Sequence, residues 1–180
     1  SIKSLGPRRA LILRSEFDDP AAIFAASMDE LKRIAGIPKD LAQNIKNGGD
    51  SKFVEEQLDI LAKSPFEIIS IFDNNYPENL SNIYDPPPVL YTHGKYLDCD
   101  HDAIAFVGTR KCTNYGKQVT EALVKELVKK KITIVSGFAR GIDTAAHRAA
   151  LKNGGRTIAA LGNGVDQVYP PENRALRREL

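Results

Sequence analysis

Apolar residues in the first third of the chain recur every three or four positions, which is the spacing of amphipathic helices. Residues that favour helix starts precede several of these segments: Pro7, Asp18, Asp19, Pro20 and Ser27. Glu30 follows Ser27 at the capping-box position, and Gly48 with Gly49 interrupts the helical spacing before it resumes at Phe53. The pattern predicts a bundle of four or five short helices over residues 1–64.

The pattern changes after Pro65, where β-forming residues become closely spaced. Residues 66–72 predict one strand and residues 89–91 a second short one, whereas the prolines between positions 77 and 88 indicate a connection with little regular structure. We therefore place a domain boundary near residue 65. It divides the chain into a helical domain, 1–64, and a second domain, 65–180.

Strands and helices alternate from residue 103 onward. Apolar runs over residues 103–107, 132–135 and 157–161 are typical of strands buried on both faces. The helix predicted over residues 116–130 has an apolar face made by Val119, Ala122, Leu123, Leu127 and Val128. A second helix through residues 145–151 completes a pattern that indicates a parallel sheet with right-handed crossovers.

The predicted fold class is therefore α/β, with a Rossmann-like parallel sheet preceded by a small all-helical domain. Doubly wound sheets usually contain more strands than the three predicted here. We expect the chain to hold the first half of such a sheet and to be a fragment of a longer protein.

Composition limits the classes of function. The 180 residues are 42% hydrophobic and 27% charged, as in ordinary globular proteins, and the net charge is only +2. Any anion-binding site must therefore be local. Cys99 and Cys112 are too few for a disulfide framework, and no apolar run approaches the roughly 20 residues of a membrane span. We expect a cytoplasmic protein without a signal peptide or membrane contact.

A glycine-bearing loop follows each of the three predicted strands. The carboxyl ends of parallel strands meet at one edge of a sheet, where glycine N–H groups and helix N-termini can bind an anion. Arg110, Lys111 and Arg140 make phosphate the best candidate. The candidate residues are Gly108, Thr109, Arg110, Lys111, Ser136, Gly137, Phe138, Ala139, Arg140, Gly141, Gly162, Asn163 and Gly164. The alternative is that these glycines only close tight strand–helix turns.

Other chemistry is poorly supported. No loop matches GxGxxG or GxxxxGK[ST], and Ser136 with Gly137 stands where a dinucleotide domain needs an acid, so no cofactor is expected. Asp143 and His147 lie four residues apart but lack a third metal ligand. We expect Asp143 to interact with the helix start, and we predict no catalytic or metal-binding residue.

Three motifs resemble signatures of the DNA processing protein A family (DprA, also called Smf). Residues 105–110, followed by Tyr115-Gly116, are similar to the family's opening VG[ST]R…YG, and residues 134–151 are similar to its second signature, SG[LG]A.GID..AH..AL. Residues 157–173 resemble the third. The resemblance implies an N-terminal helical, sterile-alpha-motif (SAM)-like domain before an extended Rossmann fold.

The resemblance also implies a function. Such proteins bind and protect single-stranded DNA without sequence specificity and load the RecA recombinase onto it during natural transformation. They act as dimers and without enzymatic turnover. Carried over to this chain, Gly108, Thr109, Arg110 and the loop of residues 136–141 would contact DNA phosphates. The dimer and RecA surfaces would lie largely after Leu180.

Two features of the second loop go beyond the resemblance. Many members carry a small or aliphatic residue where this chain has Arg140, so the phosphate role of Arg140 is an inference from its charge. Phe138 stands beside the predicted phosphate cluster. Its ring either stacks on a base or tucks under the loop, and the sequence favours neither.

The helical region carries a weaker nucleic-acid signal. Residues 5–10 and 35–41 resemble helix–hairpin–helix turns, whose backbone N–H groups can bind a phosphate. Neither copy has the usual Gly-x-Gly, and Pro7 and Pro38 each remove a backbone donor. A packing role or a partner surface is favoured there over DNA contact.

Two other functions compete with the leading hypothesis. One is an enzyme acting on a nucleoside monophosphate, since phosphoribohydrolases of a related fold bind phosphate on similar loops. Those enzymes share a Pro-Gly-Gly-x-Gly-Thr-x-x-Glu stretch that this sequence does not contain. The other is a structural domain that binds only protein, which the three glycine loops disfavour.

Overall fold

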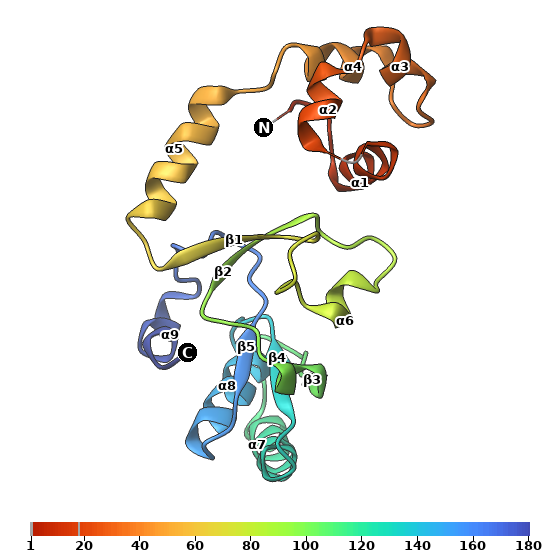
Figure 1. Cartoon of the computed structure of the whole chain (residues 1–180). Coiled ribbons are helices and arrows are strands. Elements are labelled where there is room, and N and C mark those ends of the chain that lie inside the picture. The colour runs from red at the N-terminus through yellow and green to blue at the C-terminus, as the bar shows by residue number, and fades with distance from the viewer. Residues whose placement is uncertain (1, 18) are drawn as a thin grey trace. The chain divides into compact units, whose positions relative to one another are not determined.

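The computed structural model describes residues 2–17 and 19–180. Contacts between residues divide the chain into two compact units, Ser1–Gly94 and Lys95–Leu180 (Figure 1), and each is described by itself. This division falls later than the boundary near residue 65. The domains proposed from the sequence, 1–64 and 65–180, therefore remain a prediction.

The first unit begins with the predicted short helices. They are α1 (Pro7–Glu16), α2 (Pro20–Ala25), α3 (Met28–Arg33), α4 (Lys39–Lys46) and α5 (Ser51–Ala62). The Asp19 carboxylate accepts the Ala21 N–H at 2.9 Å, and Ser27 and Glu30 form both hydrogen bonds of the capping box, which confirms these helix starts. Asp18, predicted at the same start as Asp19, lies outside the described residues.

Helices α1, α3 and α4 enclose a small core with these buried residues: Leu13, Ala26, Leu31, Ile37, Leu41, Ala42 and Ile45. Helix α5 lies outside this core. None of its residues is buried, and Phe53, Leu58 and Ile60 are exposed. Gly48 and Gly49 both have positive φ and separate α5 from α4, as predicted.

Strands β1 (Phe66–Ser70) and β2 (Val89–His93) confirm the two strands predicted after Pro65. They pair antiparallel with each other, from Phe66 opposite His93 to Ser70 opposite Val89. The connection between them was expected to be irregular, but it contains a short helix, α6 (Glu78–Ser81). Strands β1 and β2 form a sheet that is separate from the parallel sheet, and both strands belong to the first unit, Ser1–Gly94.

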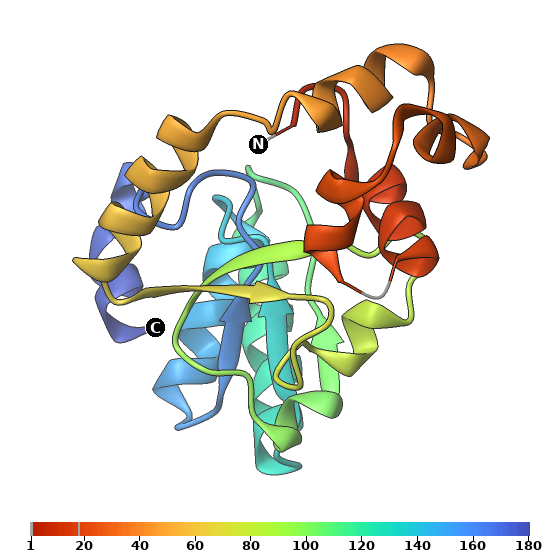
Figure 2. The same cartoon turned by 45° about the horizontal axis from the view of Figure 1, so that its top comes forward.

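The second unit contains the predicted parallel sheet. Strands β3 (Ala103–Ala105), β4 (Thr133–Ser136) and β5 (Thr157–Ala159) pair in the order β3-β4-β5. Helices α7 (Asn114–Lys129) and α8 (Ile142–Lys152) connect them and pack against each other and against β4, as can be followed in Figure 2. The α/β class is confirmed. Short 3-10 turns η1 (Asp98–His101) and η2 (Pro171–Asn173) and helix α9 (Arg174–Glu179) complete this unit.

The prediction that all three strands are buried on both faces is wrong for β3, and the residues of β5 are only partly buried. Ile104 is exposed, and Val107, just beyond the strand, is 81% exposed. When strands follow one another in order, right-handed crossovers place both connecting helices on one face of the sheet. Among the described residues, α7 and α8 cover that face, and β3 is an edge strand.

The buried face of α7 also differs from the prediction. Val119 and Leu123 are exposed, whereas Thr120 and Val124 are buried. The core beneath α7 and α8 consists of Val124, Ile134, Ala146, Ala149 and Ala150, with Phe106, Leu127 and Val128 packed against it. Thr120 fits this core because its hydroxyl donates to the Gly116 carbonyl at 2.8 Å.

A buried ion pair joins elements at the amino ends of β4 and β5. Asp100 is almost fully buried and accepts hydrogen bonds from Arg156 at 2.5 and 2.7 Å and from the Thr133 hydroxyl at 2.9 Å. Burial raises the pKa of Asp100, but the hydrogen bonds from Arg156, the Leu97 N–H and Thr133 outweigh it and hold the pKa below its usual value. No local pattern in the sequence predicts this pair.

No described helix combines the length and apolar character that a membrane crossing requires.

Candidate nucleic-acid interface

The first two glycine loops meet at the start of α8. The Ile142 N–H donates to the Thr109 carbonyl at 3.3 Å. A Cβ atom on Gly108 would lie 2.6 Å from the Ile142 side chain, and one on Gly141 would overlap the Thr109 carbonyl oxygen. Gly141 also has a φ of +81°. Glycine is therefore required at both positions for the loops to approach each other.

Asp143 holds the second loop against the first turn of α8. Its carboxylate accepts the Ala139 N–H at 3.2 Å and would lie 2.9 Å from a Cβ on Gly137. The Thr144 hydroxyl donates to the Ala139 carbonyl at 2.6 Å, and the Ser136 hydroxyl donates to the Phe106 carbonyl at 2.6 Å. Asp143 thus lies in the first turn of α8 but binds the loop before the helix, and α8 has no side-chain cap at Gly141.

Phe138 is buried, with only 1% of its surface exposed. Its φ of 61° turns the ring inward, where it lies 5.7 Å from the His147 ring. The ring is tucked under the loop and does not stack on a base in this conformation. A φ above zero is unusual for a bulky residue, and the sequence did not signal it.

Arg140 is already paired within the protein. Its guanidinium donates to both carboxylate oxygens of Glu172, at 3.0 and 3.2 Å, and lies 5.6 Å from the centre of the Tyr169 ring. Glu172 raises the pKa of Arg140; the pKa of Glu172 is itself lowered by its own backbone N–H and by Arg140. A phosphate at Arg140 would therefore have to compete with Glu172, and the phosphate role of Arg140 stays a prediction.

The segment around residue 173 reinforces this arrangement. Asn173 is buried, and its side-chain amide donates to the Phe138 carbonyl at 3.1 Å and to the Thr144 hydroxyl at 2.8 Å. Residues 169–173 therefore close over the second loop.

The third loop is organised by its own polar groups. The Asn163 amide donates to the carbonyls of Gly164 and Gln167 at 3.0 and 3.1 Å. A Cβ on Gly164 would collide with Asp166, whereas one on Gly162 would meet nothing within 4 Å. The Ala160 N–H donates to the Ser136 carbonyl, which places the start of this loop beside the second one.

Arg110 and Lys111 are the exposed cations of the first loop. The Thr109 hydroxyl accepts the Lys111 N–H at 3.2 Å and so fixes the turn that carries both side chains. Within the described part of the chain, neither side chain has an ion-pair partner. The two cations and the helix start of α8 can therefore offer positive charge to an anion.

His147 lies beneath the second loop and is fully buried. Its Nδ1 is 2.7 Å from the Thr157 hydroxyl, while Nε2 has no hydrogen-bond partner among the described residues. Burial lowers the pKa of His147 to about 4, although Asp143 and the Ser136 backbone act in the opposite direction. The described residues contain no group of three metal ligands.

The hairpin turns of the first unit are held by Arg9. Its guanidinium donates to the carbonyls of Gly36 and Ser4, at 3.1 and 2.9 Å. Arg9, one of the basic residues that could have faced a phosphate, therefore joins the two turns instead. This contact fits the packing role favoured by the sequence.

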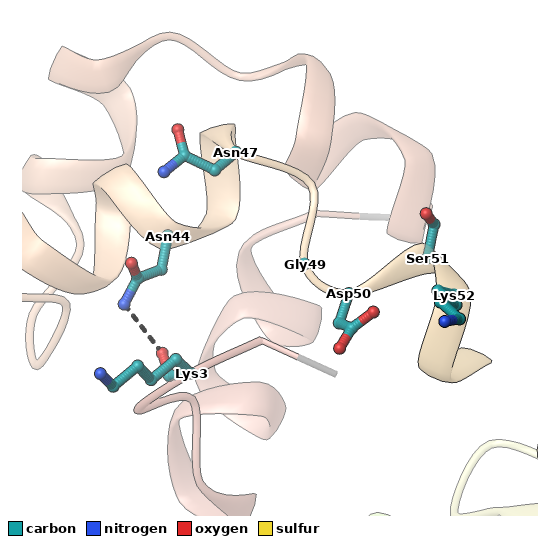
Figure 3. Close-up of a pocket in the computed structure, with 7 residues that line it drawn as sticks. All are labelled: Lys3, Asn44, Asn47, Gly49, Asp50, Ser51 and Lys52. Atoms are coloured by element: carbon teal, nitrogen blue, oxygen red, sulfur yellow. Dashed lines mark hydrogen bonds between the residues drawn. The ribbon is translucent and has the colours of Figure 1, made fainter.

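A pocket of about 440 Å³ lies in the same unit, between the end of α4 and the start of α5 (Figure 3). Its lining residues are Lys3, Asn44, Asn47, Gly49, Asp50, Ser51 and Lys52. The Asn44 amide donates to the Lys3 carbonyl at 3.1 Å. No residue of the predicted phosphate site lines this pocket.

Comparison with known proteins decides the family. A family model described as DNA recombination-mediator protein A matches residues 67–180, which is more than half of the chain. The chain belongs to the DNA recombination-mediator protein A family. The resemblance carried by the three motifs is thereby confirmed. A second model, the SAM-like helix-hairpin-helix tandem, matches residues 1–48 and agrees with the helical region.

Two members of the DNA recombination-mediator protein A family illustrate the similarity. DNA processing protein DprA of Streptococcus pneumoniae (strain ATCC BAA-255 / R6) is 45% identical over 112 residues, covering 62% of this chain and 39% of that protein. Protein Smf of Synechocystis sp. (strain ATCC 27184 / PCC 6803 / Kazusa) is 35% identical over 190 residues, covering 99% of this chain and 46% of that protein. The chain thus spans less than half the length of these relatives.

Solved structures of the family show the same fold. The X-ray structure of DNA processing protein A from Streptococcus pneumoniae superposes with a TM-score of 0.77 at 32% identity, over 97% of this chain and 59% of that one. The protein from Helicobacter pylori, whose structure was described for its single-stranded DNA binding mode, superposes with a TM-score of 0.54 at 32% identity. That match covers 63% of this chain and 51% of the other.

Proposed function

We propose that this chain binds single-stranded DNA without sequence specificity and protects it. The DNA phosphates would bind to the loop of residues 108–111, which contacts the start of α8. One observation carries the proposal. Gly108 and Gly141 let two loops meet at a helix start, and Arg110 and Lys111 stand exposed beside it. Family membership and the single-stranded DNA binding described for the Helicobacter pylori protein support it.

The chemistry of such a site explains the lack of specificity. Backbone N–H groups and cationic side chains contact phosphate oxygens, which are the same at every nucleotide. Each phosphate neutralised by a lysine or arginine releases counterions, so the affinity must fall as salt rises. The net charge of +2 is too small to attract DNA without a local site.

Fluorescence anisotropy with labelled single-stranded and duplex oligonucleotides, over a series of salt concentrations, tests the proposal. Arg110→Ala is expected to weaken single-strand binding severalfold and to reduce the salt slope by about one phosphate contact. Arg148→Ala is the matched control, because Arg148 is an exposed arginine further along α8. It is expected to retain the affinity and the slope of the unaltered chain.

Two outcomes would contradict the proposal. Equal affinity for Arg110→Ala and the unaltered chain would remove Arg110 from the site. Absence of DNA binding, together with a nucleoside monophosphate that raises the thermal unfolding midpoint, would favour the enzyme hypothesis instead.

We further propose that the whole protein is a cytoplasmic dimer that loads RecA onto single-stranded DNA without catalysing a reaction itself. Family membership supports this role. The test uses full-length protein and single-stranded DNA coated with a single-strand-binding protein. RecA-dependent ATP hydrolysis is expected to begin sooner in its presence, and an unchanged lag would contradict the proposal.

A further inference from the structure

Tyr115 presents an exposed aromatic ring directly after the first loop. It lies in the first turn of α7 and is 76% exposed. The Thr113 hydroxyl accepts the Gly116 N–H at 3.1 Å and caps the helix. A Cβ on Gly116 would lie 3.5 Å from Ile142, so the start of α7 packs against the start of α8. Tyr115 is therefore carried by a fixed element that follows the loop of Arg110 and Lys111 directly along the chain.

The other rings of Lys95–Leu180 are engaged. The sequence places five phenylalanine and tyrosine residues there: Tyr96, Phe106, Tyr115, Phe138 and Tyr169. Phe106 packs against the core, Phe138 is buried on His147, Tyr96 lies edge-on to His101, and Arg140 covers Tyr169. Within the described part of the chain, no ring or cation contacts Tyr115 in this way.

We propose that Tyr115 stacks on a base of the single-stranded DNA whose phosphates the first loop binds, and that this contact makes the site prefer single strands over duplexes. The inference rests on the proposed function. Proteins that bind single strands combine a basic track for the backbone with aromatic rings for the bases, and stacking tolerates any sequence. Phosphate contacts by Arg110 and Lys111 exist in both kinds of DNA. Bases of a duplex are already stacked on one another, so only a single strand offers a free face.

A protein interface is the competing use of this surface. Val119, Ala122 and Leu123 extend the exposed apolar side of α7 beyond Tyr115. A protein partner would use this whole side and would tolerate an aliphatic residue at position 115. A stacked base needs the ring itself and the neighbouring cations. Arg110 and Lys111 are exposed and closely precede Tyr115 in the chain, which favours the base.

The test compares an oligothymidine with an oligonucleotide of equal length whose sugars lack bases. The variants of the 180-residue chain are Tyr115→Phe, Tyr115→Leu, Leu123→Ala and Arg110→Ala. Tyr115→Leu is expected to lose about tenfold or more in affinity for oligothymidine and nothing for the abasic strand. Its preference for single strand over duplex falls by the same factor. Tyr115→Phe and Leu123→Ala are expected to behave like the unaltered chain, with circular dichroism verifying that each variant is folded.

The outcomes separate this inference from the proposed function. If Arg110→Ala weakens binding to both oligonucleotides while Tyr115→Leu binds oligothymidine normally, the stacking contact is refuted and phosphate binding stands. If neither variant changes either affinity, both proposals fail. If Tyr115→Leu and Leu123→Ala change the oligomeric state by analytical ultracentrifugation without changing the base dependence, the surface is a protein interface and the inference is overturned.

Discussion

The first and second glycine loops of the second unit look alike in sequence but differ in structure. Each follows a parallel strand, precedes a helix and carries an arginine. In the first loop Arg110 is exposed, whereas in the second Arg140 is bound to Glu172 and Phe138 is buried. One loop is open to an anion, and the other is closed by residues from 29 to 35 positions away.

The difference shows that glycine at a strand end has two separate uses. Gly108 and Gly141 allow two backbone segments to come together, which is a structural task. Binding a phosphate additionally needs N–H groups and cations without internal partners. The first loop retains such cations. In the second loop the arginine, Arg140, is paired with Glu172, and we call this ion pair the clamp.

The largest expected effect concerns the glycine at which the two loops meet. Gly141→Ala is expected to lower the free energy of unfolding by about 3 kcal/mol or more, because it combines a positive φ with overlap of the Thr109 carbonyl. Gly162→Ala is the control, since a Cβ there meets nothing within 4 Å. Chemical denaturation of both variants measures the difference. Equal stability would show that the loops do not need this close approach.

The buried histidine beneath the closed loop predicts a pH dependence. The pKa of His147 falls from 6.5 to about 4 on folding, so the unfolded chain binds the proton more readily. The contribution of the neutral His147 to the free energy of unfolding is therefore complete above pH 6.5. It is lost as the pH falls toward 4, by about 3 kcal/mol in total. Hydrogen exchange of the α8 amides across this range measures it locally.

His147→Gln is the variant that isolates this titration, because glutamine carries no proton to gain. Its acid-dependent loss of protection in α8 is expected to be smaller than that of the unaltered chain. His101→Gln, at an exposed position, serves as the control. The same acid dependence in all three proteins would contradict the burial of His147 as its cause.

A smaller effect is expected from opening the clamp. Glu172→Ala leaves Arg140 without its carboxylate, and the freed guanidinium can contact a phosphate. Single-strand affinity is expected to rise severalfold and the salt slope by about one contact. Stability hardly changes, because the pair is exposed to solvent.

Glu126→Ala is the matched control for this change. Glu126 is an exposed carboxylate paired with Lys129, so its loss alters the net charge equally without touching the second loop. An equal rise in affinity for both variants would show that the change in net charge causes the rise. The release of Arg140 from Glu172 would then not contribute to DNA affinity.

Local signals in the sequence were sufficient for most of the elements. Ser27 with Glu30 and Asp19 with Pro20 define helix starts through bonds within three residues. Alternating apolar runs were enough for the parallel sheet. The exposure of β3 was not predictable in this way, because it depends on the strand order and on both helices lying on one face.

The residues of the candidate site could be predicted from the sequence, but the pairing and burial of their side chains could not. The motifs located the three loops, and Arg110 is as exposed as a phosphate ligand must be. The pairing of Arg140 depends on Glu172, 32 residues away, and the burial of Phe138 depends on a positive φ. Neither the pairing of Arg140 nor the burial of Phe138 can be predicted from the neighbouring residues in the sequence. The exposure of Tyr115 likewise follows from how α7 packs.

The central claim is that Arg110 is free for phosphate and Arg140 is not. Its most direct test is the slope of log affinity against log salt, on one single-stranded oligonucleotide, for Arg110→Ala and for the double variant Arg140→Ala/Glu172→Ala. The double variant keeps the net charge unchanged. We expect a slope smaller by about one contact for Arg110→Ala and an unaltered slope for the double variant. A reduced slope for the double variant, with a normal slope for Arg110→Ala, would contradict it.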